Sequence, residues 1–208
     1  RVDTWLCPGC TPKLPWITGS ICTRCGLPLE RTGLCTRCRG EALPRLSLIR
    51  SLLLFEGPLR DAIHRLKYRH GWRMARPLGE LMANYWKAHP MPTDVIVPVP
   101  LHPTRFLRRG YNQSALLAGE LGRQVNLPME ETALQRVRVT ATQMRLKAAE
   151  RRRNVAGAFR CSDGRMEGRN VLLIDDVCTT GATLEACADA LREGGATDVW
   201  ALTLARAP

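Results

Sequence analysis

The feature that most constrains the fold of this sequence is a short apolar run that ends in two acidic residues and a loop of small side chains. Residues 171–174 are all apolar, Asp175 and Asp176 follow, and the loop from Cys178 to Thr183 leads into a helical pattern at 183–193. In an open α/β sheet, ligands bind beyond the carboxyl ends of the strands, against the N-termini of the following helices. The pattern therefore predicts a ligand site at the end of a strand in such a sheet.

The residue types of this loop suit a sugar phosphate. Adjacent carboxylates can accept hydrogen bonds from neighbouring sugar hydroxyls, and the loop offers backbone N–H groups and threonine hydroxyls at the positive end of a helix dipole. Glycine at position 181 lets the backbone approach a phosphate closely. The alternative is an ordinary polar turn with a threonine cap. The predicted ligand residues are Asp175, Asp176, Cys178, Thr179, Thr180, Gly181, Ala182 and Thr183.

From residue 46 onward, apolar runs alternate with amphipathic helical patterns. The patterns predict strands at 46–55, 94–101, 133–139, 158–161, 170–175 and 198–204. They predict helices at 59–69, 73–87, 114–125 and 183–193, the last one ended by Gly194 and Gly195. This alternation is typical of an α/β fold with a mostly parallel sheet flanked by helices.

The first 45 residues differ from the rest, because they are rich in Cys, Gly, Pro and Arg and have no amphipathic period. Two Cys-x-x-Cys pairs separated by nine residues form the ligand set of a zinc ribbon, in which four thiolates close a structural tetrahedral site. The metal would supply the folding free energy that a module without a core lacks. The alternative is a pair of disulfides. The predicted ligands are Cys22, Cys25, Cys35 and Cys38.

Two further groups of cysteines call for an interpretation. Cys7 and Cys10 are half of a second zinc site, which is either completed by residues upstream of Arg1 or left without metal. Cys178 lies where a helix dipole can lower a thiol pKa, although its small size is the simpler reason for its presence. We expect two domains, a zinc ribbon at 1–45 and an α/β domain at 46–208.

The chain carries 31 Lys and Arg against 19 Asp and Glu, a formal net charge of +12. This charge suits an anionic partner, such as a phosphorylated metabolite, a nucleic acid or a membrane surface, although it also serves solubility alone. No apolar run is long enough to span a bilayer, and no secretory signal is visible at the N-terminus. Because paired Cys-x-x-Cys units indicate reduced, metal-binding thiols, we expect a cytoplasmic protein.

The loop at 175–183 closely resembles the motif with which type I phosphoribosyltransferases bind 5-phosphoribosyl-1-pyrophosphate (PRPP). Nearly the whole chain resembles the ComF/GntX (competence protein F) family. The segments that carry this resemblance are Glu-Gly-Pro-Leu-Arg at 56–60, Ile-His-Arg-Leu-Lys-Tyr at 63–68, Val-Pro-Leu at 99–101, Arg-Arg-Gly-Tyr-Asn-Gln at 108–113, Thr-Ala-Thr-Gln at 140–143, Arg151, Arg153-Asn154 and Ala158-Phe159. The resemblance implies a type I phosphoribosyltransferase-like domain behind an N-terminal zinc ribbon.

The resemblance also implies roles for two loops and for Mg²⁺, which accompanies PRPP. The arginine-rich composition of 145–153 agrees, because a pyrophosphate needs Arg, Lys or Mg²⁺ to take up its charge. A solvated helix face or a nucleic-acid contact is the alternative for 151–153. For Lys67 and His102 we expect packing or a surface position. The implied residues are Val99, Pro100, Leu101, Arg105 and Arg109 in a pyrophosphate loop, and Gln143, Arg151, Arg153 and Asn154 in a mobile loop at 139–155 that closes over PRPP.

Two functions from different classes stay open. By resemblance, the chain is a PRPP-binding protein that handles single-stranded DNA in natural transformation, with protein partners in the DNA-uptake machinery. The alternative is an active phosphoribosyltransferase that joins ribose 5-phosphate to a base and releases pyrophosphate. PRPP binding supports both functions. Because the sequence ends directly after its last predicted strand, we expect no C-terminal hood over an acceptor base, which favours the binding role.

The N-terminal module offers a second cationic surface for DNA. Phosphate contacts and base stacking would hold a single strand there. Because the phosphate loop belongs to the other predicted domain, we expect Arg24 and Arg37 to contribute to DNA binding alone. The candidate DNA-binding residues are Trp5, Trp16, Arg24, Arg31, Arg37 and Arg39.

Overall fold

The computed structural model describes residue 9 and residues 11–40, 45–68, 71–138, 148–161 and 164–207. Its strands are β1 Leu48–Leu54, β2 Val95–Pro98, β3 Leu134–Arg136, β4 Phe159–Cys161, β5 Asn170–Cys178 and β6 Asp198–Arg206. Its helices are α1 Thr36–Arg39, α2 Gly57–Lys67, α3 Ala75–Ala88, α4 Pro103–Arg109, α5 Gln113–Val125, α6 Ala148–Val155 and α7 Ala182–Glu193, with short 3-10 turns η1 Thr11–Lys13 and η2 Gly71–Met74. Within these residues, no helix combines the length and the apolar character that crossing a bilayer requires.

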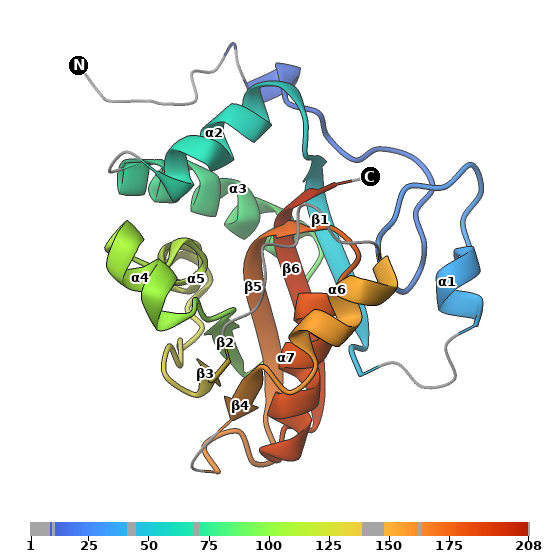
Figure 1. Ribbon diagram of the computed structural model, residues 1–208. Coiled ribbons are helices and arrows are strands. Elements are labelled where there is room, and N and C mark those ends of the chain that lie inside the picture. Colours follow the sequence, from blue (N-terminus) through green and yellow to red (C-terminus); the bar gives the residue numbers. More distant parts are fainter. Residues whose placement is uncertain are drawn as a thin grey trace.

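Strands β1, β6, β5 and β2 form one parallel sheet in that order (Figure 1). Strand β5 lies inside this sheet, and residues 171–174 are accordingly all buried. The register pairs Asp175 with Thr203 and Cys178 with Arg206. Strands β3 and β4 form a separate antiparallel pair. The predicted α/β fold with a mostly parallel sheet is therefore confirmed.

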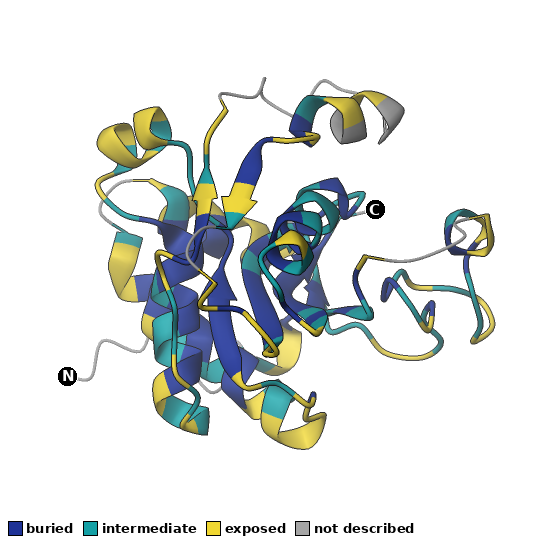
Figure 2. Cartoon of the chain, turned by 90° about the horizontal axis from the view of Figure 1, so that it is seen from below, coloured by how far each residue is buried: buried dark blue, intermediate teal, exposed yellow. Residues whose placement is uncertain are grey.

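The two faces of the sheet bury different sets of side chains, because successive residues of a strand point to opposite faces. Leu172 and Ile174 of β5 pack with residues of α2, α3 and α5. Val171 and Leu173 pack with residues of α7, of the β3–β4 pair and of the N-terminal cysteine module. Figure 1 shows α2, α3 and α5 on one side of the sheet and α7 on the other. In Figure 2 the buried strands lie between helices whose outer faces are exposed.

The N-terminal segment is joined to the sheet along β1. The Ile17 N–H donates to the carbonyl oxygen of Leu52 at 3.0 Å, and the Ile49 N–H donates to the carbonyl oxygen of Arg24 at 2.8 Å. A Cβ atom at Gly26, where φ is +67°, would lie 2.8 Å from the carbonyl oxygen of Ile49. Glycine is therefore the residue that allows the cysteine module to lie this close to the strand.

Several elements differ from their predicted bounds for local reasons. Helix α2 begins at Gly57. Pro58 fits the first turn of this helix, because backbone N–H groups there have no partner within the helix and the N–H that proline lacks is not needed. Strand β5 continues through both acids, because β6 pairs with it as far as Arg206. Helix α4 lies in a segment for which no helix was predicted, and the His102 side chain caps it by accepting the Thr104 N–H at 3.2 Å. The expected surface role of His102 agrees with this cap.

Candidate functional site

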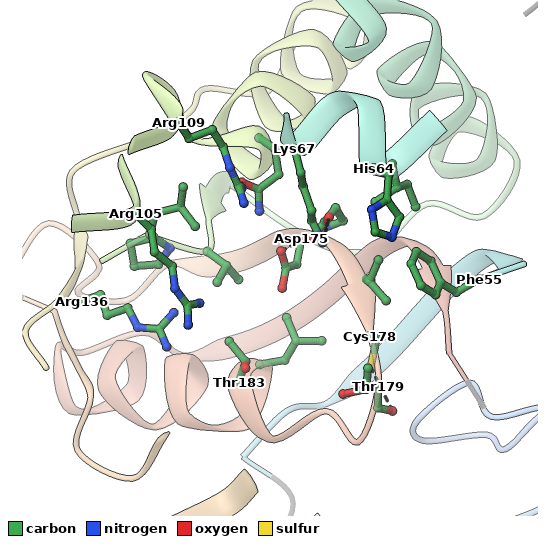
Figure 3. Close-up of a pocket in the computed structure, with 18 of the residues that line it drawn as sticks. Phe55, His64, Lys67, Arg105, Arg109, Arg136, Asp175, Cys178, Thr179 and Thr183 are labelled. Carbon is green, nitrogen blue, oxygen red and sulfur yellow. Dashed lines mark hydrogen bonds and ion pairs between the residues drawn. The ribbon is translucent and has the colours of Figure 1, made fainter. Parts of the chain in front are cut away.

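A cavity of about 380 Å³ opens at the carboxyl ends of β2 and β5 (Figure 3). This is the place where an open α/β sheet binds its ligands. The cavity brings the acidic pair and the loop before α7 together with the segment after β2 and one face of α2. Its lining residues are Phe55, Ile63, His64, Lys67, Tyr68, Val99, Pro100, Leu101, Arg105, Arg108, Arg109, Gln113, Arg136, Asp175, Asp176, Val177, Cys178, Thr179, Gly181, Ala182, Thr183 and Leu184.

Asp175 and Asp176 line the cavity with different partners. Oδ1 of Asp175 accepts a hydrogen bond from Ser114 Oγ at 2.8 Å and one from the Asp176 N–H at 2.9 Å. Oδ2 of Asp176 lies 2.5 Å from Nζ of Lys67. Burial, and then the neighbouring Asp176, raises the pKa of Asp175 to about 7. Burial also disfavours the charged form of Asp176, but the Lys67 ammonium outweighs this effect and lowers the pKa of Asp176.

The predicted phosphate loop directly follows β5. Gly181 is the N-cap residue of α7 and has a φ of 84°, a left-handed conformation that glycine adopts without strain. Thr179 and Thr183 line the cavity. The Thr180 hydroxyl instead accepts the Ala182 N–H at 3.4 Å. Cys178 is the last residue of β5, and burial raises the pKa of its thiol to about 11, so no lowering by a helix dipole is found.

A cationic wall lies across the cavity from the acids. Arg105 and Arg109 of the predicted pyrophosphate loop line it from α4, next to Val99, Pro100 and Leu101. Nη1 of Arg109 donates to Oε1 of Gln113. Figure 3 shows Arg105, Arg109 and Arg136 extending into the same space as Asp175. Guanidinium groups gathered in this way suit a phosphate or pyrophosphate group.

The predicted mobile loop takes no part in the lining of this cavity as far as the structure describes it. Gln143 lies outside the described residues, and Arg151, Arg153 and Asn154 belong to α6, which packs against α7. Arg153 is exposed, and the carbonyl oxygen of Asn154 accepts a hydrogen bond from Arg138 Nη2 at 3.2 Å. Closure of the segment 139–155 over a ligand stays a prediction.

The four predicted metal ligands lie together in the N-terminal module. The Sγ atoms of Cys22, Cys25, Cys35 and Cys38 are all within 4.8 Å of one another, and all four residues are buried. The Sγ atoms of Cys25 and Cys35 are 3.8 Å apart, the spacing that a tetrahedral site with Zn–S bonds of about 2.3 Å requires. Sγ of Cys22 accepts the backbone N–H groups of Cys25 at 3.5 Å and Cys35 at 3.4 Å. These donors stabilise a thiolate, so the residues fit a zinc ion.

Comparisons with known proteins cover almost the whole chain. Residues 2–39 match the double zinc ribbon domain, and residues 112–208 match the phosphoribosyl transferase domain. The DNA utilization protein YhgH of Salmonella typhi is 38% identical over 192 residues, which are 88% of this chain and 83% of that protein. Competence protein F of Haemophilus influenzae is 32% identical over 97% of this chain and 90% of its own length. The chain belongs to the competence protein F family. Competence protein ComFC of Bacillus subtilis, 32% identical over 99% of this chain and 86% of its own, extends the likeness.

Membership in the competence protein F family confirms the predicted resemblance and the phosphoribosyltransferase-like fold. The zinc ribbon match also supports the structural zinc site, and no disulfide joins the four clustered cysteines, which argues against the disulfide alternative. Cys7 and Cys10 fall in the matched range but outside the described residues.

Two cations of this site were not predicted from the sequence. Lys67 was expected on the surface or in packing, yet the C-terminal turn of α2 brings it to Asp176. Arg136 lies on β3 and lines the cavity next to Arg105 of α4. Burial, and then Arg105 beside it, lowers the pKa of the Arg136 guanidinium. Helical spacing already places Lys67 on the same side of α2 as Ile63, whereas no local pattern singles out Arg136.

An aromatic wall is the third feature that the sequence analysis missed. Phe55, His64 and Tyr68 line the cavity on the side of α2. The ring centroids of Phe55 and His64 are 6.3 Å apart, and those of His64 and Tyr68 are 6.4 Å apart. The Arg109 guanidinium lies 5.5 Å from the centroid of the Tyr68 ring. A planar aromatic group in the cavity would meet ring faces here.

The separation that we expected between the cysteine module and the phosphate loop is wrong. Nη1 of Arg37, on α1 of the module, donates to the carbonyl oxygen of Thr180. Nη2 of the same residue lies 3.5 Å from Oε1 of Glu185 on α7. Arg24 donates to the carbonyl oxygen of Cys38 at 2.9 Å, inside the module. Trp16, a candidate for base stacking, instead packs against the core and bridges to Leu53.

Proposed function

We propose that this chain binds PRPP with Mg²⁺ and handles single-stranded DNA during DNA uptake. The observation that carries the first half is the cavity in which Asp175, Asp176 and the 178–183 loop meet four arginines. The names of the relatives, competence protein F, ComFC and DNA utilization protein YhgH, support the second half.

Each part of PRPP has a chemically suitable partner in the cavity. The carboxylates of Asp175 and Asp176 accept hydrogen bonds from the ribose hydroxyls. The N-terminus of α7, with Thr179 and Thr183, receives the 5-phosphate. Arg105, Arg109 and Arg136 receive the pyrophosphate. Mg²⁺, when bound with PRPP, takes up further negative charge of the pyrophosphate.

Single-stranded DNA needs cations for its phosphates and exposed aromatic faces for its bases. Arg31 and Arg39 are exposed on the cysteine module. Trp72 lies in the turn η2, which follows α2, and is 53% exposed. The Arg73 guanidinium lies 5.4 Å from the centroid of the Trp72 ring. We assign DNA contacts to these two surfaces. We divide the chain into a zinc ribbon at 1–45 and a PRPP-binding domain at 46–208.

Phosphoribosyl transfer is the second candidate function, and the aromatic wall favours it. A nucleobase stacked on Phe55 and His64 would lie in the same cavity as the ribose partners Asp175 and Asp176. In that reaction the base nitrogen forms a bond to the ribose carbon, and the bond to pyrophosphate breaks. The arginine wall would stabilise the departing pyrophosphate.

One set of measurements separates the two functions. The protein is titrated with PRPP and Mg²⁺ by calorimetry, then with mixed-sequence single-stranded DNA in electrophoretic shift assays. Pyrophosphate release is followed with a panel of bases. PRPP and DNA binding without release support the proposed function. Release with a base, in the absence of DNA binding at low salt, would show that the enzyme function is the correct one.

A further inference from the structure

Arg206, at the end of β6, is a buried cation between the two sites described above. Only 3% of the residue is exposed. Its Nη1 donates to Sγ of Cys178 at 2.8 Å and to the carbonyl oxygen of Cys25 at 3.2 Å. Its Nη2 lies 3.9 Å from Sγ of Cys25. One guanidinium therefore contacts a zinc ligand and the first residue of the phosphate loop at the same time.

A buried guanidinium needs compensating negative charge. Cys178 cannot provide it, because burial keeps its thiol protonated at neutral pH. The cysteine cluster can, because four thiolates around one Zn²⁺ carry more negative charge than the metal neutralises. Arg206 therefore lies between Cys178 and the cysteine cluster, and it depends on the cluster for compensating charge.

Arg37 makes a second link between the same two sites. It lies between the ligands Cys35 and Cys38, and its guanidinium donates to the carbonyl oxygen of Thr180. A Cβ atom added to Gly181 would meet Cδ1 of Ile49 at 3.3 Å and Nη2 of Arg37 at 3.5 Å. Arg206 thus contacts the loop at Cys178, Arg37 contacts it at Thr180, and Ile49 lies against Gly181.

We propose that the zinc centre positions the phosphate loop of the cavity through Arg206 and Arg37. This inference rests on the proposed function, because it makes the zinc ribbon a determinant of PRPP affinity and not of stability alone. Neither arginine lines the cavity, so both are positioning residues. Loss of either link frees the loop to leave the conformation in which its N–H groups converge on a phosphate.

The first test uses substitutions that leave the four cysteines in place. Arg206→Lys keeps the charge but cannot contact Cys178 and Cys25 together, and Arg37→Gln removes the charge at Thr180. We expect each to weaken PRPP binding by about tenfold in calorimetry, the effect of losing one charge-assisted hydrogen bond. Thr36→Ala is the matched control, because Thr36 is an exposed residue of the same short helix. Zinc content is measured on every variant.

The second test needs no PRPP and so separates the inference from the proposed function. Amide hydrogen exchange of residues 178–183 is compared in ligand-free wild type, Arg206→Lys and Arg37→Gln. We expect faster exchange in both variants and unchanged exchange in Thr36→Ala. Unchanged exchange and unchanged PRPP affinity in zinc-loaded Arg206→Lys and Arg37→Gln would overturn the inference. Wild-type protein that fails to bind PRPP while the exchange differences persist would overturn only the proposed function.

Discussion

Two adjacent carboxylates at the end of β5 have opposite electrostatic surroundings. The Lys67 ammonium beside Asp176 holds the pKa of the Asp176 carboxyl low. Asp175 is buried next to the charged Asp176 and has a pKa of about 7. The two carboxyl groups titrate as a coupled pair, so the second of their two protons is lost near neutral pH. Asp175 is therefore the residue whose ionisation controls the number of acceptors offered to a ribose.

The raised pKa of Asp175 predicts that PRPP affinity rises with pH. A carboxylate accepts ribose hydroxyls and a protonated carboxyl does so less well, so affinity should fall by up to tenfold per pH unit below about 7. Ser114→Ala removes a hydrogen bond that lowers this pKa, so the midpoint should move to higher pH. Calorimetric titrations from about pH 6 to about pH 9 measure both shifts. A profile in Asp175→Asn identical to that of wild type would contradict the assignment.

Lys67 should stabilise the ligand-free protein through Asp176. Lys67→Met leaves a nearly buried carboxylate without its cation, at a cost of about 1–3 kcal/mol in the free energy of unfolding. Denaturant unfolding measures this loss. Lys87→Met on the exposed end of α3 is the matched control and should change little. Equal stability of the two variants would show that the ion pair is not formed in solution.

The loop before α7 owes its shape to one glycine and to its neighbours. Gly181 begins α7 in a left-handed conformation, and Ile49 of β1 lies directly over it. Because the loop is confined from several sides, its N–H groups are arranged before a ligand arrives. Such preorganisation raises affinity by reducing the entropy lost on binding.

Gly181→Ala should therefore disturb both stability and PRPP binding. The left-handed φ alone costs about 1 kcal/mol, and the added Cβ must also displace Ile49 Cδ1 at 3.3 Å. Gly157→Ala is a suitable control, because Gly157 has a φ of +62° and no atom within 4 Å of an added Cβ. Thermal unfolding should show the strain of the left-handed φ in both variants and a larger loss of stability in Gly181→Ala, and calorimetry should show a loss of PRPP affinity in Gly181→Ala alone.

The cysteine module should hold one zinc ion per chain at Cys22, Cys25, Cys35 and Cys38. Elemental analysis of Cys35→Ala should show loss of this zinc, because three thiolates no longer close the tetrahedral site. Cys161→Ala, at a cysteine outside the cluster, should retain it. A wild-type protein with oxidised, metal-free cysteines would contradict the zinc site.

At the scale of the whole molecule, the two proposed anion-binding regions of this basic chain touch each other. The net charge of +12 attracts polyanions in general. We expect the cavity to select a sugar phosphate by geometry, and we expect DNA contacts to depend on exposed cations. The contact of Arg37 with the phosphate loop means that substitutions in the cysteine module do not all act on DNA alone.

The logarithm of the affinity for single-stranded DNA should fall linearly with the logarithm of the salt concentration. Each phosphate of a single strand contributes about 0.7 to the slope of log affinity against log salt, so about five contacts give a slope near 3.5. Arg31→Glu with Arg39→Glu should weaken DNA binding and lower this slope without changing PRPP affinity, since both residues are exposed and neither lines the cavity. Arg37→Glu should weaken the binding of both PRPP and DNA. Shift assays beside calorimetry report the two losses separately.

The sequence by itself determined the features that depend on neighbours along the chain. Strand β5, its acids, Gly181 and helix α7 lie within one local segment, and strand period, turn conformation and helix capping act over a few residues. The four zinc ligands were predictable for the same reason, because their spacing along the chain matches one coordination shell. Likeness to a family added the arginines after β2, which composition alone does not distinguish from solvated charges.

Only the tertiary structure decided which distant residues complete the site. Lys67 reaches Asp176, Arg37 reaches Thr180 across 143 positions, and Arg206 reaches Cys25 across 181 positions. No local period encodes such pairs, because many arginines and lysines in a chain of this charge are equivalent until the sheet forms. The parallel order β1-β6-β5-β2 brings the end of β6 beside the phosphate loop and places the cysteine module along β1. Long-range packing, which depends on the closed fold, therefore selected the cations that hold the acids, the loop and the zinc ligands together.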